Sequence, residues 1–435
     1  MAPTPTLAPV ADQVTLDEAV AHVIARCEPL VAGPVPAAAA RGLVLAGEVV
    51  AAEPVPPFAN TAMDGYALRA ADTADAPVTL PVVAEVAAGH PAERALAAGE
   101  AMRIFTGAPM PDGADAVVMV ERTERLDGGA AVRVGVAVEP GNHVREPGED
   151  LRAGDVVFRP GDELTPARLG VLASLGVDEV VAFPRPRVGV ISTGDELVPG
   201  PAPLRPGQIR DSNRPTLLAL VADAGCEPVD LGWVPDDEAA ITAAVETGVA
   251  TCDAVLSTGG VSMGDIDLVR VVLDRIGDMR WMQVAIRPAK PLAFGRVPSP
   301  DGRRVPVFGL PGNPVSSLVS FAIFARPGLR RLAGFPDDRL HLPRLRAVAG
   351  EPLARRPDGK THFVRVVAAV DRSAGGRLVV ASSGGQGSHQ LAAMARADGL
   401  VVLPDGPGVE AGDEVEVVLL SPPRAVGEPM SAAAL

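Results

Sequence analysis

Three strand-like segments of this chain each run directly into a glycine-rich turn. The turns follow Val188–Ser192, Ala254–Ser257 and Val305–Phe308. The carboxyl ends of neighbouring parallel strands meet at one edge of a sheet, which is where α/β proteins bind ligands. Glycine lets main-chain N–H groups come close to an anion, and a helix that begins there adds its positive end. The pattern therefore predicts a site for an anionic, phosphorylated ligand.

Carboxylates accompany two of these turns, although a phosphate cradle alone does not require them. Asp195 and Glu196 follow the first turn, and Asp265 and Asp267 follow the second. Oxygen ligands of this kind suit Mg²⁺, which takes one or two carboxylates together with substrate phosphates. Asp195 and Glu196 could instead be solvated acids of an exposed turn. Asp265 and Asp267 could be metal ligands, contact a ribose or heterocycle, or cap the following helix.

Two cations stand next to prolines in Ile286-Arg-Pro-Ala-Lys-Pro291. The prolines restrict the backbone, so Arg287 and Lys290 form a preorganised pair that can stabilise negative charge on phosphate or molybdate. The only other lysine of the chain is Lys360, which suggests that a compact ammonium is needed at Lys290. A solvated surface pair is the alternative interpretation.

The third turn, Gly309–Ser317, is rich in proline and glycine. We expect Asn313 to cap a helix that has Pro314 at its first position, which places Ser316 and Ser317 in the first turn. Such a helix end can hold an oxyanion without a charged side chain. A rigid turn without a ligand is the alternative.

Composition and charge exclude several classes of protein. Apolar residues make up 47% of the 435 residues, which is typical of a folded chain too long for one core. The net charge of −15 argues against binding to nucleic acid or to an acidic membrane, and no apolar run is long enough for a membrane span. Three distant cysteines and scattered histidines favour a reducing cytoplasm and no zinc centre. The first residues lack a secretory signal pattern, which also favours the cytoplasm.

Secondary-structure patterns predict a multidomain protein of α/β plus β-rich domains. Domain I is mixed and discontinuous, at residues 12–58 and 144–182, and begins with a helix near Thr15–Arg26. Domain II is a small β-rich lobe at residues 59–143. Domain III, residues 183–335, alternates strands and helices and is predicted to be a central three-layer α/β domain with parallel strands. Domain IV, residues 340–420, is predicted to be β-barrel-like.

Eight short blocks, taken in order, resemble the signature motifs of the molybdopterin molybdenumtransferase family, which includes MoeA and the gephyrin E-domain. The blocks are Asn60–Ala67, Arg103–Pro109, Gly148–Asp150, Ser192–Leu197, Asp211–Arg214, Ser257–Gly264, Gly309–Ser316 and Gln386–His389. The resemblance extends from about residue 12 to residue 420.

The resemblance implies an enzyme of molybdenum cofactor biosynthesis. It would insert molybdate into adenylylated molybdopterin with release of AMP, with Mg²⁺ as cofactor. It would form an elongated homodimer with the active site between subunits, where the α/β molybdopterin-binding domain of one faces the lobe carrying Met63–Tyr66 of the other. A molybdopterin adenylyltransferase is an implied partner, and neither nucleic acid nor a membrane is.

The resemblance also assigns roles to positions of this chain. The implied catalytic residues are Asp64, Asp150, Glu196, Asp267 and Lys290, and the implied Mg²⁺ ligands are Asp195 and Glu196. The implied substrate-binding residues are Thr106, Arg145, Asp195, Ser257, Gly259, Gly260, Asp265, Arg287, Pro311, Gly312, Asn313, Pro314, Ser316, Arg365 and Ser388. A further acid of the family matches either Asp236 or Asp237, and the sequence does not decide between them.

The chain departs from the family pattern at several positions. Gln283 and Arg287 stand where related sequences can have lysine, and Arg145 begins a segment that is less basic than usual. Ala289 replaces the usual glycine of a Pro-Gly-Lys-Pro motif, which leaves the local backbone conformation open.

Two other functions use the same features. One is nucleotide hydrolysis or adenylyl transfer on the α/β domain, and the complete set of flanking domains argues against it. The other is a non-catalytic scaffold of the gephyrin type, which would need an extra domain and a long linker.

Overall fold

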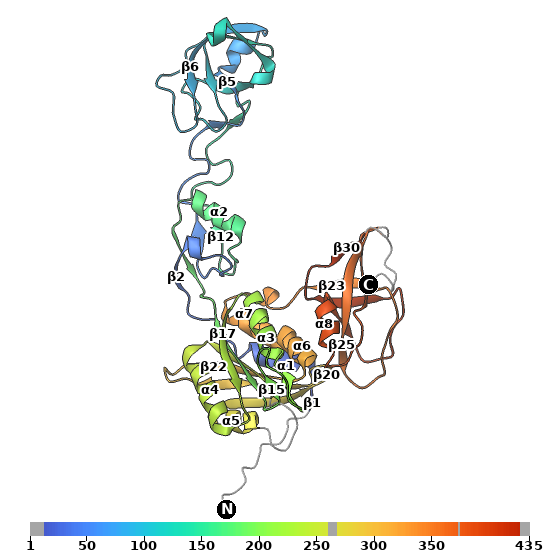
Figure 1. Ribbon diagram of the computed structural model, residues 1–435. Coiled ribbons are helices and arrows are strands. Elements are labelled where there is room, and N and C mark those ends of the chain that lie inside the picture. The colour runs from blue at the N-terminus through green and yellow to red at the C-terminus, as the bar shows by residue number, and fades with distance from the viewer. Residues whose placement is uncertain (1–12, 260–267, 373–374, 427–435) are drawn as a thin grey trace, which may run out of the picture. The chain divides into compact units, whose positions relative to one another are not determined.

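The structure, a computed structural model, describes residues 13–259, 268–372 and 375–426 (Figure 1). These residues form two compact units. The first contains the chain up to Gly33, Gly42–Val44 and the chain from Ala182 onward, and the second contains Pro34–Arg41 and Leu45–Val181. Each unit has its own buried cores, so each is described by itself.

A seven-stranded sheet forms the centre of the first unit, in the order β1-β19-β21-β22-β18-β14-β17. Its strands are β1 (Gln13–Val14), β14 (Arg187–Thr193), β17 (Glu227–Val234), β18 (Ala254–Thr258), β19 (Asp278–Val284), β21 (Pro291–Pro298) and β22 (Arg304–Leu310). β14 is parallel to both β17 and β18, and β18 is parallel to β22. These strands are separated by helices, which matches the predicted crossovers.

One part of this sheet departs from the parallel arrangement. β21 runs antiparallel to both of its neighbours, β19 and β22. The segments between them are short, at residues 285–290 and 299–303. A parallel pair needs a crossover of about a dozen residues or more, so these short connections impose hairpins instead.

Helices cover both faces of the sheet, which confirms the predicted three-layer arrangement. The helices of the α/β region are α1 (Leu16–Ile24), α3 (Asn213–Asp223), α4 (Glu238–Thr251), α5 (Leu268–Ile276), α6 (Pro314–Ser320) and α7 (Arg326–Leu332). Residues of α1, α3, α6 and α7 share a core with Phe294 and Phe308 of the sheet. Residues of α4 and α5 pack on the other face against Val255 and Val307. A sheet buried on both faces explains why its central strands are apolar almost throughout.

The first helix begins with the capping box that its sequence predicts. The Thr15 hydroxyl accepts from the Glu18 N–H at 3.2 Å, and the Glu18 carboxylate accepts from the Thr15 N–H at 2.8 Å. β1 pairs in parallel with β19, and Ala19 and Val23 are buried in the α/β core. The start of predicted domain I therefore packs with the α/β region.

The helical segment after the third turn reaches Leu332 through a five-residue π-type stretch at Phe321–Ala325 between α6 and α7. Asn313 is the N-cap of α6 and Pro314 its first residue, as expected, but the Asn313 side chain makes no capping hydrogen bond. The structure supplies a reason. Pro314 has no N–H group, and the Val315 N–H already donates to the Ser388 carbonyl at 3.1 Å.

A closed five-stranded barrel, β23-β26-β25-β27-β29, completes the first unit. Its elements are β23 (Arg344–Ala349), β25 (Thr361–Asp371), β26 (Arg377–Ser382), α8 (Leu391–Arg396), β27 (Gly399–Leu403) and β29 (Glu414–Leu419). Outside the barrel, β20 (Ile286–Arg287) and β30 (Arg424–Val426) each pair with β25. Phe363 and Leu400 of the barrel are buried in the same core as Phe308. The barrel and the α/β region therefore share one core, and β20 joins them directly.

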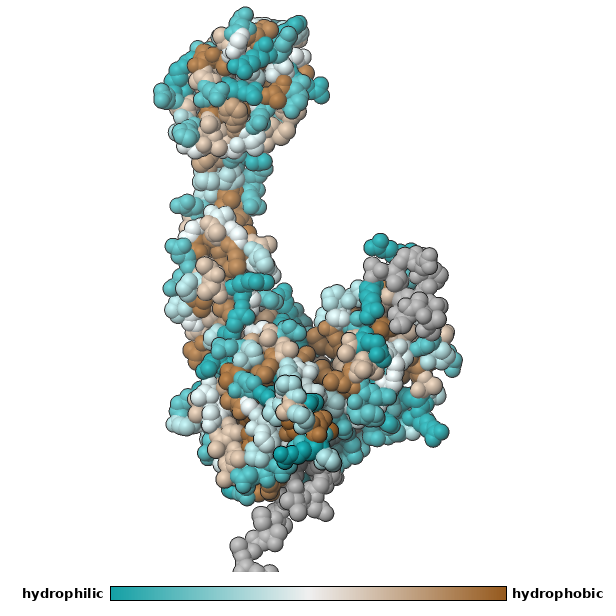
Figure 2. Space-filling model, in the orientation of Figure 1, coloured by the Kyte–Doolittle hydropathy of each residue, from teal (hydrophilic) through white to brown (hydrophobic). Residues whose placement is uncertain are grey.

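The second unit contains a six-stranded sheet in the order β8-β5-β7-β6-β10-β9, which confirms the predicted β-rich lobe. Its strands are β5 (Gly65–Leu68), β6 (Val78–Val86), β7 (Ala101–Ile104), β8 (Ala116–Met119), β9 (Thr123–Leu126) and β10 (Ala131–Val134). Hydrophilic and hydrophobic residues are interspersed on the visible face of this lobe (Figure 2).

The rest of the second unit is built from short two-stranded pairs and one α-helix. Its elements are β2 (Gly33–Pro36), β3 (Val49–Val50), β4 (Asn60–Thr61), β11 (Val144–Arg145), β12 (Val156–Phe158), α2 (Pro166–Ser174) and β13 (Glu179–Ala182). Among the described residues of both units, no helix has the length and apolar character needed to cross a membrane.

Candidate active site

The first glycine-rich turn places Asp195 and Glu196 just beyond β14, where both are exposed. The Trp233 ring N–H donates to the Gly194 carbonyl at 2.8 Å and fixes the turn against β17. The Glu196 side chain folds back over Gly194, where an added Cβ would collide with its carboxylate. Gly194 also has φ of +143°, a conformation that favours glycine, and the turn presents two carboxylates at the carboxyl edge of the sheet.

The structure separates Asp236 from Asp237, which the sequence leaves undecided. Asp236 lies beside Asp195: its carboxylate accepts from the Asp195 N–H at 3.3 Å, and its N–H donates to the Asp195 carboxylate at 3.0 Å. Asp237 instead caps α4, accepting from the Ala240 N–H at 2.8 Å. Asp236 therefore belongs to the strand-edge group of acids, and Asp237 has a structural role.

Residues of the Asp211–Arg214 motif connect the ends of the strands and the third turn by hydrogen bonds. Asp211 is almost fully buried and accepts from the Ser192 hydroxyl at 2.6 Å and from the Arg214 guanidinium at 3.1 Å. Asn213 donates at 2.8 Å both to the Thr258 hydroxyl and to the Gly312 carbonyl. One short segment thus fixes β14, β18 and the third turn relative to one another.

The second and third turns approach each other closely. Gly259 has φ of +96°, and a Cβ there would lie 2.5 Å from the Thr193 carbonyl oxygen. A Cβ at Gly312 would lie 3.7 Å from the Cα of Gly259. Ser257 and Pro311, both predicted to bind substrate, are buried beside these turns. The described parts of the three turns therefore lie next to one another at the carboxyl edge of the sheet, as the sequence predicts.

The predicted cation pair lies in a cavity of about 320 Å³ between the α/β region and the barrel. Arg287 and Lys290 line it from the loop after β19, and Ser316 lines it from α6. Lys360 and Ser388 line it from the barrel side. Both lysines of the chain therefore reach one cavity. The cavity combines cations with hydroxyl groups, a set of donors that suits a tetrahedral oxyanion.

Arg365, predicted to bind substrate, is fully buried and does not line this cavity. Its guanidinium donates to the carbonyls of Gly385 and Gly387, and Gln386 exchanges two hydrogen bonds with its main chain, each of 3.0 Å. Burial lowers the pKa of Arg365. The observed contacts make Arg365 the support of the loop that carries Ser388.

The departure at Ala289 has a clear structural consequence. Ala289 adopts φ of +72° and is buried, and it follows a cis peptide bond between Arg287 and Pro288. Its φ is in the left-handed region that glycine adopts without strain. Alanine thus adopts here the backbone conformation that a glycine would favour. Arg287 and Lys290, on either side of it, both line the cavity.

The second unit carries Asp64, Thr106, Arg145 and Asp150, all exposed. The Asp64 carboxylate accepts from the Thr106 N–H at 2.7 Å and from the Thr106 hydroxyl at 2.8 Å. These two bonds hold the pKa of Asp64 below its usual value. Two predicted functional residues are therefore in direct contact, and Asp64 is a preformed carboxylate.

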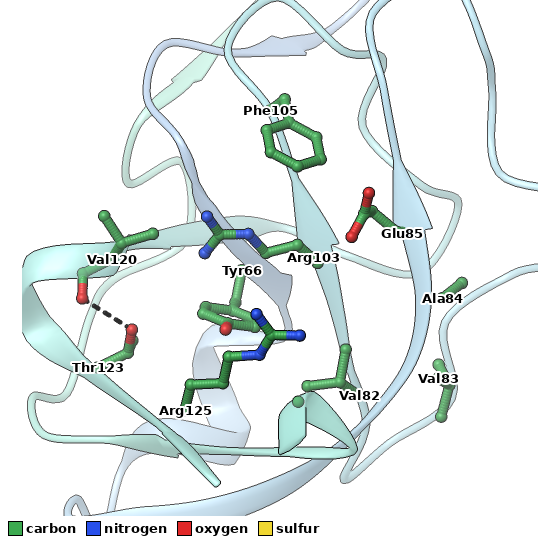
Figure 3. A pocket seen from close by; sticks show the side chains of 11 residues that line it. Tyr66, Val82, Val83, Ala84, Glu85, Arg103, Phe105, Val120, Thr123 and Arg125 are labelled. Carbon is green, nitrogen blue, oxygen red and sulfur yellow. Dashed lines mark hydrogen bonds between the residues drawn. The ribbon is translucent and has the colours of Figure 1, made fainter. Parts of the chain in front are cut away.

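A cavity of about 630 Å³ lies next to this pair, in the same lobe. Figure 3 shows Arg103 between the rings of Tyr66 and Phe105, with Arg125 beside Tyr66. The Arg103 guanidinium carbon lies 5.0 Å from the Tyr66 ring centre and 5.4 Å from that of Phe105. The Val120 N–H, at the rim, donates to the Asp64 carbonyl at 3.2 Å. Arg103 begins one of the family blocks, and its place in the lining of this cavity was not predicted from the sequence.

Three of the predicted site residues lie outside the part of the chain that the structure describes. Gly260, Asp265 and Asp267 are not among the described residues. Within the described parts of the chain, no three histidine, cysteine or acidic side chains come together as a ready metal site. The three cysteines are free and buried.

Family models match three successive parts of the chain. The model for the MoeA N-terminal region (domain I and II) matches residues 14–176, and the model for the probable molybdopterin binding domain matches residues 189–331. The model for the MoeA C-terminal region (domain IV) matches residues 346–420.

Whole-chain comparisons agree with these matches. Molybdopterin molybdenumtransferase 2 of Mycobacterium tuberculosis (strain H37Rv) is 42% identical over 410 residues, covering 92% of this chain and 96% of that protein. The molybdopterin molybdenumtransferase of Haemophilus influenzae is 37% identical over 375 residues, covering 86% of this chain and 90% of its own length. A crystal structure of the molybdopterin biosynthesis moeA protein from Pyrococcus horikoshii OT3 aligns with a TM-score of 0.77 at 30% identity, covering 94% of this chain and 100% of that one. The resemblance seen in the sequence is confirmed, and the chain belongs to the molybdopterin molybdenumtransferase (MoeA) family.

Proposed function

We propose that this protein inserts molybdate into adenylylated molybdopterin and releases AMP, as an enzyme of molybdenum cofactor biosynthesis. The observation that carries this proposal is the cavity where Arg287, Lys290, Ser316 and Ser388 converge. Both substrates are anions, and the chain has a net charge of −15. A local cluster of cations is therefore needed to overcome the general repulsion.

The two substrates occupy neighbouring parts of the first unit in this proposal. Molybdate binds to Arg287 and Lys290, whose charges oppose its own. The loop from Pro311 to Ser317 holds the pterin phosphate or the molybdate, since its main chain lies close to Gly259. Asp267 would contact the adenylylated substrate. Ser257, Gly260 and Asp265 would also bind this substrate.

The carboxylates Asp195 and Glu196 fit Mg²⁺, which prefers oxygen ligands and retains places for phosphate oxygens. Both are exposed at the strand edge, so a nucleotide phosphate can reach them. Bound there, Mg²⁺ would neutralise negative charge on the phosphates of the adenylylated substrate. Asp236, held against Asp195 through main-chain hydrogen bonds, fixes the orientation of the first of these carboxylates.

Residues of the second unit would complete the site from another subunit. Asp64 and Asp150 are the proposed catalytic carboxylates. Thr106 and Arg145 are the proposed substrate-binding residues. The hydrogen bonds from Thr106 keep Asp64 ionised, as a carboxylate that orients substrate or accepts a proton must be. The protein would thus be a cytoplasmic homodimer that receives its substrate from a molybdopterin adenylyltransferase.

An AMP-release assay tests this proposal. Purified protein is incubated with adenylylated molybdopterin, molybdate and Mg²⁺, and AMP is measured over time. We expect release that requires both molybdate and Mg²⁺ and that is lost in Glu196→Gln and in Asp64→Asn. Release that does not depend on molybdate would favour a nucleotide hydrolase, and full activity in both variants would contradict the assignment of the site.

A further inference from the structure

We infer that the cavity of the β-rich lobe is a further anion site, in which Arg103 binds a forked oxyanion, the carboxylate or phosphate of a small ligand. The cavity has a volume of about 630 Å³, within the range of small-molecule sites, roughly 300–1,000 Å³. None of the described residues that line it belongs to the set assigned to the reaction. The inference therefore does not depend on the proposed function.

The register of the lobe's sheet gathers three side chains around Arg103. Arg103 of β7 is the register partner of Tyr66 on β5 and of Glu85 on β6. Register partners on neighbouring strands place their side chains on the same face of a sheet, and so do residues two apart along the chain. Phe105, two residues after Arg103, therefore joins Tyr66 and Glu85 at the cavity, as Figure 3 shows.

Aromatic rings, rather than an anion, hold the guanidinium of Arg103. It lies 5.0 Å from the Tyr66 ring centre and 5.4 Å from that of Phe105, and the negative faces of the rings attract it. Among the described residues, this guanidinium has no hydrogen-bond or ion-pair partner. Its N–H groups are therefore available to a ligand, and their fork matches two oxygens of a carboxylate or phosphate.

Arg125 supplies a second cation from the hairpin of β9 and β10. Its guanidinium donates to the Gly128 carbonyl at 3.0 Å, which holds the side chain across the turn. Gly129, at φ of +108°, leaves room for it, because an added Cβ would overlap the guanidinium. This hydrogen bond uses one N–H group, so the others can reach a ligand in the cavity that Arg125 lines.

The charge of the cavity differs from that of the lobe around it. Residues 59–143 contain more acids than arginines and no lysine. Among the described lining residues, however, two arginines stand against one carboxylate, that of Glu85. Glu85 is exposed, so its attraction for Arg103 is weak. A local excess of positive charge within an acidic lobe favours the entry of an anion.

Fluorine NMR of the full-length protein tests the inference, because Tyr66 is the only tyrosine of the chain. Protein labelled with 3-fluorotyrosine gives one signal, from the ring beside Arg103. Sodium phosphate and sodium acetate are titrated separately at constant ionic strength, and we expect a saturable shift with at least one of them. The anion that saturates at the lower concentration shows which of the two groups the site prefers.

Variants of the cavity should change this binding in opposite directions. We expect Arg103→Gln to weaken it by about tenfold or more, because a charge-assisted, two-pronged contact is lost. Arg103→Lys keeps the charge without the fork and should recover only part of the affinity. Arg125→Gln should weaken binding by a smaller factor, and Glu85→Gln should strengthen it by removing a competing anion. Circular dichroism verifies that each variant is folded.

Two controls separate this site from general effects of charge. Arg133→Gln removes a positive charge from an exposed position of the same lobe, where Arg133 pairs with Glu124, and should leave the titration unchanged. Lys290→Met, in the other unit, should also leave it unchanged.

Three results would overturn the inference: no saturable shift with either anion, equal weakening in Arg103→Gln and Arg133→Gln, or loss of the shift in Lys290→Met. Because AMP release is not measured, failure of the proposed reaction would not affect this test.

Discussion

Asp195 and Asp236 each accept a hydrogen bond from the other's main-chain N–H group, at 3.0 and 3.3 Å. This reciprocal pair fixes the turns after β14 and β17 side by side at the strand edge. Asp237, one residue further, caps α4. Neighbouring acids of the same type therefore have different roles, and variants of each should give different results.

We predict that Asp236→Ala lowers AMP release by about tenfold while leaving stability nearly unchanged, because it removes the carboxylate that accepts from the Asp195 N–H and so weakens the support of Asp195. Asp237→Ala should instead lower the free energy of unfolding by about 1 kcal/mol, since it removes a helix cap, and should leave activity near wild type. Urea unfolding and the AMP assay measure the two effects. The reverse assignment, with activity lost only in Asp237→Ala, would contradict this distinction.

The second prediction concerns the protonation of Asp64. The Thr106 N–H and the Thr106 hydroxyl both lower the pKa of Asp64, in that order of importance. Thr106→Val removes the hydroxyl and keeps the N–H, so the pKa of Asp64 should rise towards its ordinary value without reaching it. Carbon-detected NMR titration of the carboxyl group measures this shift. Thr123→Val is the control, because its hydroxyl bonds to Val120 in the same lobe; equal titration curves in Thr106→Val and wild type would refute the prediction.

The third prediction concerns the left-handed backbone at Ala289. A β-branched side chain is far less tolerated at positive φ than alanine, so Ala289→Val should destabilise the protein by roughly 2 kcal/mol or more. Ala289→Gly should be close to neutral, because the relief of strain is offset by the lost methyl contact and the greater freedom of the unfolded chain. Ala239→Val, on the exposed face of α4, should cost only a few tenths of a kcal/mol. Similar losses at both positions would show that the backbone at Ala289 is unstrained.

The fourth prediction is a loss of stability on mild acidification. Burial is the main cause that lowers the pKa of His22 and of His362 below the ordinary 6.5. The unfolded chain therefore takes up protons near pH 6.5 that the folded chain accepts only at lower pH. Below pH 6.5 the unfolded state binds more protons, so the free energy of unfolding should fall as the pH falls.

Tryptophan fluorescence can follow this effect, because Trp233 and Trp281 both lie in the first unit. His22→Phe keeps an aromatic ring beside Phe294, which the histidine contacts edge-on, and should make the pH dependence shallower. Replacing the exposed His90 of the other unit by glutamine should not change it. An unchanged slope in His22→Phe would rule out His22 as a source of the effect.

Much of the fold follows from local signals in the sequence. Thr15 and Glu18 form the predicted capping box, and the strand before each glycine-rich turn lies where its apolar run predicts. The antiparallel path of β21 was not predicted, because the β-α alternation that indicates parallel strands ends before this strand. The pairing of β1 with β19 was also missed, since two residues carry no periodic signal.

Site residues that are close together in the sequence could be predicted. Contacts between residues from distant segments could not. Arg287 and Lys290 were found because prolines flank them, but their meeting with Lys360 depends on the pairing of β20 with β25. The buried position of Arg365 was likewise not evident, because an arginine is usually exposed. The separation of Asp236 from Asp237 needed the start of α4, which sequence patterns place only to within a few residues.

The most direct test of the central claim is a comparison of AMP released with molybdenum retained in the cofactor, measured on the same sample of wild-type protein. The account predicts that the two amounts are equal, and that both fall together when Lys290 is changed to methionine or when Mg²⁺ is omitted. AMP release in excess of molybdenum incorporation, undiminished in the absence of molybdate, would contradict it.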